Sequence, residues 1–493
     1  MARESSGKHD DVIPPGWTNP IPPRAYRLLV LGGGCAAVRA AIEAARLTGP
    51  VALVAPRIDA DGGVDDATAA RLDFWQFVHA TVGEPLSGAT TAAYSPPAAR
   101  FAEWTADNRR VDRRAVQLRR AQQLGDLGIE VHFGSAVFTG TDTVAVHGRE
   151  LKFERAIVAP GVATSTTGAI AAQLATSDAG PWLTADNWSR LEALPRRLAI
   201  LGGSLAAVEL ADAFSELGVE VHLIYAAGEL LPGEDPAAVA CVKRGLERAG
   251  VRLHGQARLR DVEQLASARL VTIEQANEPR KLLADELLVL EQAPHWSALD
   301  GLAAARLTLC DAGLVVDGRL RTTNSKIFAA GVGCAASTPL GDAEGYGRLA
   351  VRNALLSGGE HYSSVVVPRV IRARPQLVQV GCTTLDASEL GVELDTYRCA
   401  LNGHFDHFAL VHTRRGTGRL LGATLVAADA ATLAPLLTLV VKEQLSLETL
   451  AELTAGHLAG FEALRTIAQQ YARRGAVATT AKINAANEIA ARV

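Results

Sequence analysis

The chain has 493 residues, of which 48% are apolar and 21% are charged, and its formal net charge is −4. This length exceeds what a single hydrophobic core organises, so we expect about three domains. The near balance of charges gives no electrostatic reason to expect binding to nucleic acid or to an anionic membrane, and no apolar run is long enough to span a bilayer.

The first 24 residues are polar and rich in proline, which predicts an extended segment on the protein surface. The N-terminus has no apolar signal segment, so the cytoplasm is the predicted location. The six cysteines are scattered, and none forms a CxxC or another metal-ligand spacing. We therefore expect no metal site and interpret the cysteines as small apolar residues of the interior.

A glycine turn organises the first domain. The apolar run Leu28–Leu31 ends in three glycines, passes into a helix-forming stretch, and is followed by a second apolar run, Val51–Val54. The turn has the pattern G-x-G-x-x-A, with Gly32, Gly34 and Ala37 at the defining positions. This pattern predicts a strand–turn–helix–strand unit whose free backbone N–H groups and positive helix end hold a pyrophosphate.

A second copy of this pattern begins 170 residues further along the chain. The apolar run Leu198–Leu201 leads into a turn in which Gly202, Ser204 and Ala207 hold the three corresponding positions. A helix and the apolar strand Val219–Ile224 follow. A lone glycine pattern is a weak signal, but two copies in the same context predict two dinucleotide sites.

The elements between and after these turns predict an α/β protein in which one dinucleotide domain is inserted into another. A polar helix is expected over 107–127, and a strand ends in the break Pro160-Gly161. After the second unit the chain returns with strands at 314–318 and 326–331 and a helix at about 344–356. Residues 368–427 alternate between apolar and polar positions, which predicts antiparallel strands, and helical periodicity follows over 428–472.

We therefore expect two nested Rossmann-like domains and a C-terminal α+β interface domain. The expected boundaries are an N-terminal lead over 1–24, a first dinucleotide domain over 25–190 and 301–364, a second over 191–300, the interface domain over 365–475 and a tail over 476–493.

This order of parts resembles the pyridine nucleotide-disulfide oxidoreductases, the family of mercuric reductase, lipoamide dehydrogenase and glutathione reductase. The resemblance rests on LGGGCAA at 31–37, DGG at 61–63, LPRRLAILGGSLAAVELADAF at 194–214, LRTTNSKIFAAG at 320–331 and VPRVIRARPQLVQVG at 367–381. It implies FAD in the first domain, NAD(P)H in the second and a homodimer formed through the third. The residues implied for FAD are Gly32, Gly34, Ala37, Gly62, Gly63, Gly161 and Gly331, and those implied for NAD(P)H are Gly202, Ser204, Ala207 and Glu209.

The chain departs from the family at the redox centre. In the family a Cys-x-x-x-x-Cys pair follows the two glycines and exchanges electrons with the flavin, but Asp65 and Ala70 occupy those positions here. Neither side chain can form the thiolate that this chemistry needs, so dithiol chemistry is excluded at this site. The lysine expected just beyond is Phe74. Its usual partner, Glu209, is therefore expected either to pair with Arg71 or another base, or to lie on the helix surface.

The nucleotide contacts are altered as well. The acid expected to bind the adenosine ribose is Ala55, and the aspartate of the C-terminal flavin motif is Val332. After Ile224 the chain reads Tyr225-Ala226-Ala227, which offers neither an acid for a 2′-hydroxyl nor an arginine for a 2′-phosphate. Each lost polar contact is expected to weaken binding by about 1–3 kcal/mol. FAD occupancy and the choice between NADH and NADPH stay open.

A histidine and a glutamate near the C-terminus correspond to the acid–base couple that the partner subunit contributes in the family. They are His457 and Glu462, five residues apart. A histidine suits proton transfer and a carboxylate orients its ring, so these two are the candidate catalytic residues. A purely structural role at the subunit interface is the alternative, because the cysteines that they would serve are absent.

Two functions are compatible with these features. One is an FAD-dependent NAD(P)H oxidoreductase that passes electrons from the flavin directly to a small-molecule acceptor of unknown identity, since the cofactors carry the chemistry. The other is a non-catalytic homologue with weak or no flavin binding, acting as a structural or regulatory dimer or as the partner of an active homologue.

Overall fold

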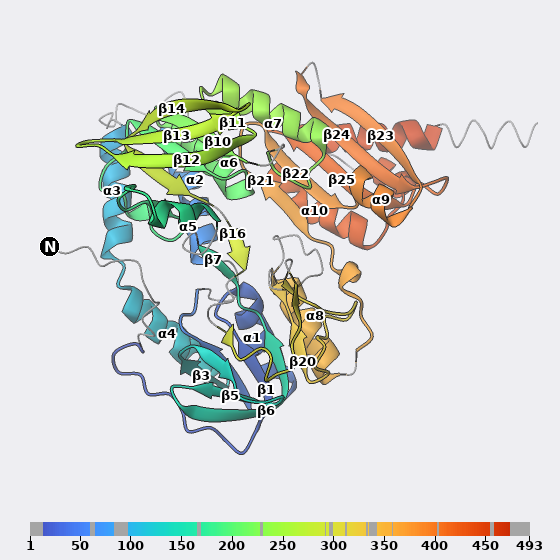
Figure 1. Cartoon of the computed structure of the whole chain (residues 1–493). Helices are drawn as coiled ribbons and strands as arrows, with labels where there is room; N and C mark the ends of the chain where they lie inside the picture. The colour runs from blue at the N-terminus through green and yellow to red at the C-terminus, as the bar shows by residue number, and fades with distance from the viewer. Residues whose placement is uncertain are drawn as a thin grey trace, which may run out of the picture. The chain divides into compact units, whose positions relative to one another are not determined.

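The computed structural model of the chain describes residues 13–59, 65–82, 97–164, 169–226, 230–290, 292–294, 299–310, 313–331, 334, 343–356, 358–401, 404–453 and 458–473. The chain divides into two compact units, Met1–Ala226 with His254–Val365, and Ala227–Leu253 with Val366–Val493 (Figure 1). Of the helices in the described ranges, none combines the length and the apolar character that a membrane span requires.

The first unit contains an eight-stranded sheet of strand order β17-β4-β5-β6-β1-β2-β3, with β20 also paired to β6. β1 runs parallel to β2 and β6, and the parallel strands are buried because helices cover them, which explains their continuous apolar sequences. The predicted strand–turn–helix–strand unit is confirmed as β1, α1 and β2. The bounds are β1 Tyr26–Leu31, α1 Cys35–Leu47, β2 Val51–Ala55, β3 Ile129–Phe133, β4 Ala136–Phe138, β5 Thr143–Val146, β6 Arg149–Val158, β17 Leu299–Asp300, β20 Ile327–Ala329 and α8 Ala343–Leu355.

Between β2 and β3 the described residues form the helices α2 Asp66–Val82, α3 Pro97–Arg110 and α4 Arg113–Asp126. The expectation of one continuous helix over 107–127 is wrong, because the chain breaks between α3 and α4. Asp112 sits at this break and its carboxylate accepts a hydrogen bond of 2.9 Å from the backbone N–H of Arg114. An aspartate at a helix N-terminus satisfies an otherwise unpaired N–H group, so it starts a new helix.

The first unit also contains the second predicted strand–turn–helix–strand unit, which is confirmed as β9, α6 and β10. β9 runs parallel to β10 and to β15, in a five-stranded sheet of order β11-β10-β9-β15-β8, and a separate antiparallel sheet has the order β12-β13-β14. The bounds are β8 Leu183–Thr184, β9 Arg197–Leu201, α6 Leu205–Glu216, β10 Glu220–Tyr225, β11 Arg252–Gly255, β12 Ala257–Gln264, β13 Arg269–Gln275, β14 Glu278–Ala284 and β15 Glu286–Val289. Shorter elements are β7 Val162–Thr164, α5 Ala169–Ala175, η1 Trp188–Arg190, β16 Gln292–Pro294, β18 Leu309–Cys310, β19 Gly313–Leu314 and η4 Tyr362–Ser364.

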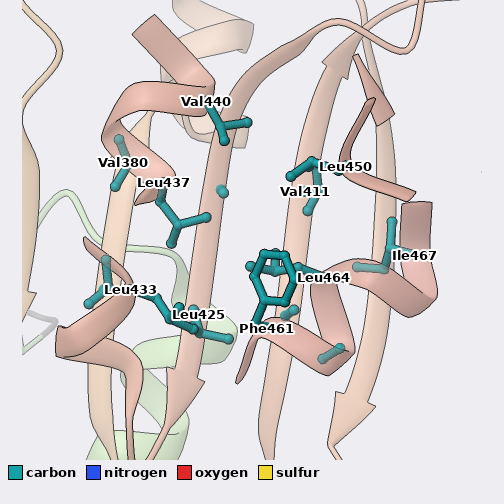
Figure 2. Close-up of a cluster of buried hydrophobic side chains, with 14 of the residues drawn as sticks. Val380, Val411, Leu425, Leu433, Leu437, Val440, Leu450, Phe461, Leu464 and Ile467 are labelled. Atoms are coloured by element: carbon teal, nitrogen blue, oxygen red, sulfur yellow. The ribbon is translucent and has the colours of Figure 1, made fainter. Parts of the chain in front are cut away.

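The second unit is built on a five-stranded antiparallel sheet of order β21-β22-β25-β24-β23, as the alternating pattern predicted. Helical residues of α10 and of 459–473 pack on one face of this sheet, where Leu437 and Leu464 lie near Val380, Val411 and Leu425 (Figure 2). The bounds are α7 Pro236–Arg248, β21 Pro368–Ile371, β22 Gln376–Gly381, α9 Thr384–Leu390, β23 Leu394–Leu401, β24 His404–Arg414, β25 Leu420–Ala427, α10 Ala430–Lys442 and α11 Leu447–Ala451.

The short helix α9 interrupts the predicted series of strands. Its start is a capping box, in which the Thr383 hydroxyl accepts from the Asp386 N–H and the Asp386 carboxylate accepts from the Thr383 N–H. Its end is Gly391, which has the left-handed conformation that favours glycine. These signals are visible in the sequence, but the alternation of the surrounding strands obscured them.

Candidate functional site

The first glycine turn leaves the N-terminus of α1 open. Gly32 has φ +129°, and a Cβ there would lie 1.9 Å from the carbonyl oxygen of Ala159, so no other residue fits without movement of the backbone. Gly34 is the N-cap residue of α1, and no described atom lies within 4 Å of a Cβ built on it. A helix N-terminus without a side-chain cap, facing open space, is the arrangement that holds a pyrophosphate.

Two more of the predicted glycines follow strands of the same sheet. They lie at the edge where the carboxyl ends of the parallel strands meet, as Gly32 does. Gly161 follows β6 and Gly331 follows β20, and both strands run parallel to β1, after which Gly32 comes. Both glycines have φ +77°, and a Cβ on Gly331 would lie 3.3 Å from the Cβ of Ala36 in α1. No described atom lies within 4 Å of a Cβ built on Gly161. The carboxyl ends of parallel strands are where such sheets bind ligands.

The structure describes only some of the other residues that were predicted at the flavin site. Ala37 is buried in the first turn of α1. Gly62, Gly63 and Val332 lie outside the described residues, so their relation to the open end of α1 stays a prediction.

The second glycine turn has the same backbone but a different helix start. Gly202 has φ +137°, and a Cβ there would lie 2.9 Å from the carbonyl oxygen of Leu290. Ser204 caps α6, because its hydroxyl accepts a hydrogen bond of 3.4 Å from the N–H of Ala207. Tyr225, at the end of β10, is turned over Gly255, where a Cβ would lie 2.7 Å from the tyrosine hydroxyl. It is 6% exposed and offers no charge to a ribose or a phosphate.

The end of β2 offers no acid at the position that the family uses. Ala55 is 1% exposed, and its Cβ lies 3.2 Å from the position of a Cβ built on Gly33. The loop after β2 folds back over the turn, since the Asp59 N–H donates to the Gly33 carbonyl at 2.9 Å. The Asp59 carboxylate forms an ion pair with Arg57, and burial raises the pKa of this carboxyl.

Asp65, the residue predicted to occupy the family's first cysteine position, lies near the first glycine turn. Asp65 precedes α2, and its carboxylate accepts a hydrogen bond of 2.7 Å from the Thr68 N–H. Burial raises the pKa of the Cys35 thiol to about 12, and the negative charge of Asp65 contributes to this rise. The Asp66 N–H donates to the Asp59 carbonyl at 2.8 Å, and the Asp59 N–H donates to the Gly33 carbonyl, so the start of α2 lies near the first glycine turn. Asp65 comes directly before this helix and Ala70 lies on it.

All six cysteines are free thiols. Burial raises the pKa of Cys334 to about 12 as well. A thiol with this pKa is ionised to only about one part in 10⁴ at pH 8.

We expect iodoacetamide at pH 8 to modify the exposed Cys310 well before Cys35 or Cys334 in the native protein. Raised thiol pKa values mean that less of the reactive thiolate is present, so alkylation of the two buried cysteines increases only at strongly alkaline pH or on unfolding. Peptide mass mapping over time measures the order. Modification of Cys35 as fast as Cys310 would contradict this assignment, and the unfolded protein in urea serves as the control.

Glu209 forms a buried ion pair with Arg71. The guanidinium Nε of Arg71, on α2, lies 2.5 Å from a carboxylate oxygen of Glu209, on α6, and the side chains are 15% and 3% exposed. The interpretation of Glu209 as a helix-surface residue is therefore wrong, and the alternative that Arg71 replaces the missing lysine as its partner is confirmed. The pair joins α2, which carries Ala70 and is preceded by Asp65, to α6, the helix of the second glycine turn.

Phe74, the residue predicted to replace the family's lysine, is fully buried in a cluster of aromatic rings. Its ring centroid lies 4.9 Å from that of Phe214, 5.0 Å from that of Trp188 and 5.1 Å from that of Trp104. Phe77 and Phe101 complete the cluster at 6.0 Å each. Sequence reasoning missed this cluster, although aromatic residues three apart on α2 and on α3 are a signal that one helix face is shared.

Of the two residues of the predicted acid–base couple, the structure describes only Glu462. His457 lies outside the described residues. Glu462 lies in the helical segment 459–473, and its carboxylate accepts from the Arg465 guanidinium at 2.8 Å. Within the described ranges, no group of three His, Cys, Asp or Glu side chains is arranged to hold a metal ion.

Two parallel α/β units with glycine turns, followed by an antiparallel sheet with helices on one face, define the class of two-nucleotide flavoprotein reductases. Residues 26–350 match the family model of the pyridine nucleotide-disulphide oxidoreductases, and the chain belongs to that family. The family consists of FAD-dependent oxidoreductases that use NAD(P)H.

Individual relatives agree with this assignment. The chain is 29% identical to the mercuric reductase of Bacillus cereus over 458 residues, which cover 89% of this chain and 70% of the relative. It is 27% identical to the dihydrolipoyl dehydrogenase of Bacillus subtilis over 278 residues, or 54% of this chain and 59% of the relative.

Solved structures share the fold. LpdA from Mycobacterium tuberculosis superposes with a TM-score of 0.74 at 24% identity, covering 90% of this chain and 99% of LpdA. The HOCl-induced flavoprotein disulfide reductase RclA from Escherichia coli superposes with a TM-score of 0.71 at 22% identity, covering 90% and 99%.

Proposed function

We propose that this protein is an FAD-dependent NAD(P)H oxidoreductase that passes electrons from the flavin directly to a small-molecule acceptor, without a protein dithiol. The observation that carries the proposal is the pairing of an open pyrophosphate cradle at Gly34 with a carboxylate, Asp65, at the position of the first redox cysteine. A carboxylate cannot exchange electrons with a flavin or attack a disulfide, so the acceptor has to meet the flavin itself.

The residues of the first turn fit the diphosphate of FAD. α1 begins without a side-chain cap, and no described atom lies within 4 Å of a Cβ built on Gly34. Gly161 and Gly331 present backbone with positive φ at the same edge of the sheet. The ribose acid is missing at Ala55, which lowers the expected affinity without removing the cradle. When bound there, the flavin supplies hydride acceptance from NAD(P)H and electron transfer to the acceptor.

The buried Arg71–Glu209 pair serves this chemistry by holding a fixed charge and not by moving a proton. A guanidinium stays protonated over the whole physiological pH range, whereas a lysine at such a site can lose its proton. The ion pair spans α2 and α6, so it also fixes the distance between the helices that border the two glycine turns. The same proposal places the flavin on 25–190 and 301–364, the nicotinamide nucleotide on 191–300, and the contacts of a homodimer on 365–475.

The test begins with the colour of the purified protein. A flavin spectrum near one FAD per chain, bleached by NADH or NADPH in the absence of air and restored by oxygen, a quinone or a dye, supports the proposal. Disulfide and mercuric substrates form the control arm, in which no turnover is expected. Turnover of a disulfide that depends on this chain's own thiols would refute the assignment of Asp65 and Ala70.

The alternative is a non-catalytic homologue that binds flavin weakly or not at all. It is favoured by the apolar Ala55 and by the inward turn of Tyr225, both at positions where the family holds a nucleotide. Colourless protein whose melting temperature does not change with added FAD, NADH or NADPH is the outcome that selects this alternative.

We expect Asp65→Asn to bind FAD about fivefold more tightly than the natural protein, because it removes a negative charge beside the cradle of an anionic diphosphate, worth about 1 kcal/mol. Asparagine caps a helix as well as aspartate does, so α2 is expected to keep its start. Asp66→Asn is the matched control, since the Asp66 carboxylate is bound by Arg120. Titration of apoprotein with FAD, followed by flavin fluorescence, gives both affinities. Equal or weaker binding by Asp65→Asn contradicts the expectation.

A further inference from the structure

A cavity of about 300 Å³ lies at the edge of the first sheet, and its lining includes no residue of either glycine turn. Its walls come from the N-terminal segment, from β3, and from β5, β6 and the turn between these two strands. This volume is at the lower end of the range for small-molecule sites, roughly 300–1,000 Å³. The proposed oxidoreductase chemistry does not use it.

The N-terminal wall is firmly attached to the sheet. The Asn19 side chain donates to the Phe133 carbonyl at 2.8 Å and accepts from the Phe133 N–H at 2.9 Å, as a neighbouring strand would. The Trp17 ring meets the Phe133 ring edge-on, with centroids 5.9 Å apart. The Trp17 indole N–H is buried and has no acceptor among the described residues. The segment thus forms one side of the cavity with the Trp17 ring.

The opposite wall carries positive charge. His147 and Gly148 form a two-residue hairpin turn with φ values of 47° and 76°, closed by the pairing of Val146 with Arg149. Asparagine, aspartate or glycine is usual at the first of these positions, so a histidine there is strained and suggests a functional constraint. Arg149 follows directly, and both His147 and Arg149 line the cavity with exposed side chains.

The floor of the cavity carries a neutral imidazole. His132 is 2% exposed, and its Nε2 lies 2.8 Å from the hydroxyl of Tyr26, which donates to Glu130 at 2.5 Å. Since that hydroxyl has only one proton, Nε2 of His132 donates to it, and Nδ1 is assigned as an acceptor. Burial, and to a smaller extent the positive charge of Arg149, lowers the pKa of His132 to about 4. The ring therefore stays neutral near pH 7.

We propose that this cavity binds a small hydroxylated aromatic carboxylate. The carboxylate pairs with Arg149, the ring packs between Trp17 and the apolar side chain of Leu151, and the hydroxyl donates to Nδ1 of His132. The cavity offers a cation, a flat aromatic wall and a hydrogen-bond acceptor. These favour a ligand that carries an anionic group, a flat ring and a hydrogen-bond donor.

Calorimetric titration with 4-hydroxybenzoate tests the proposal. We expect saturable binding, with Arg149→Gln weakening it roughly 10- to 100-fold because a charge-assisted contact is lost. Lys152→Gln is the matched control, because Lys152 is an exposed cation on the same strand that does not line the cavity. 4-Hydroxybenzyl alcohol, which lacks the charge, is expected to bind more weakly by a similar factor.

His132→Phe tests the acceptor. This variant is expected to lose the preference for 4-hydroxybenzoate over benzoate, and circular dichroism reports whether it folds. If His132→Phe does not fold, the Arg149→Gln variant still tests the proposal, because the Arg149 side chain is exposed and its replacement is expected not to disturb the fold. No binding at millimolar 4-hydroxybenzoate, equal binding by Arg149→Gln, or displacement of the probe by FAD overturns the proposal. Because the readout is binding, its failure is separable from a failure of the oxidoreductase assignment.

Discussion

Phe74→Ala is expected to lower the free energy of unfolding by about 3–5 kcal/mol, because it removes the ring at the centre of a fully buried aromatic cluster. Phe74→Lys, which restores the family's residue, is expected to cost at least as much. It places an ammonium group among the rings of Trp104, Trp188 and Phe214, where no carboxylate is part of the cluster. Urea denaturation followed by circular dichroism measures both losses.

Trp75→Ala is the matched control for the cluster. Trp75 is the next residue on α2, is partly exposed, and its ring contacts His79 and not the cluster. We expect it to cost less than about 1.5 kcal/mol. A Phe74→Lys protein as stable as the natural one would show that this position still accepts the family's ammonium group, and the assignment of Phe74 to a hydrophobic core would be wrong.

Removing Arg71 is expected to cost about 3–5 kcal/mol, because Arg71→Met leaves the buried carboxylate of Glu209 without its guanidinium partner. Glu209→Leu in the same protein should recover much of this loss, since an apolar pair of similar volume avoids the desolvation of two charges. The double-mutant cycle therefore gives a coupling free energy well above zero. Stability measurements on the four proteins in urea provide it.

The exposed pair of Arg110 and Asp107 provides the comparison for this cycle. Its side chains are 80% and 79% exposed, so Arg110→Met is expected to change stability by less than about 0.5 kcal/mol. If Arg71→Met proved equally mild, the Arg71–Glu209 pair would have to be solvated in solution. It would then not hold α2 and α6 together, and the fixed-charge role proposed for it would lose its basis.

The sequence predicted the parts of this protein that depend on neighbours in the chain. The turns at Gly32 and Gly202 are readable because a buried strand, a glycine with positive φ and a helix start follow one another within a few residues. The alternation of apolar and polar residues over 368–427 predicted the antiparallel strands β22, β24 and β25, although β22 and β25 are buried at most of their positions and not on one face alone. The break at Asp112 was missed because a single cap residue weighs little against a long polar helical pattern.

Only the tertiary structure decided what happens at the altered positions. Arg71 and Glu209 are 138 positions apart in the chain, so no local pattern distinguishes a surface glutamate from a buried partner. The same holds for Phe74, whose ring neighbours Trp188 and Phe214 come from other elements. The sequence by itself determined the family, because family membership depends on residue identity at marked positions. The folded chain determined that a buried ion pair and an aromatic core now surround α2, because burial and charge pairing depend on contacts between distant segments.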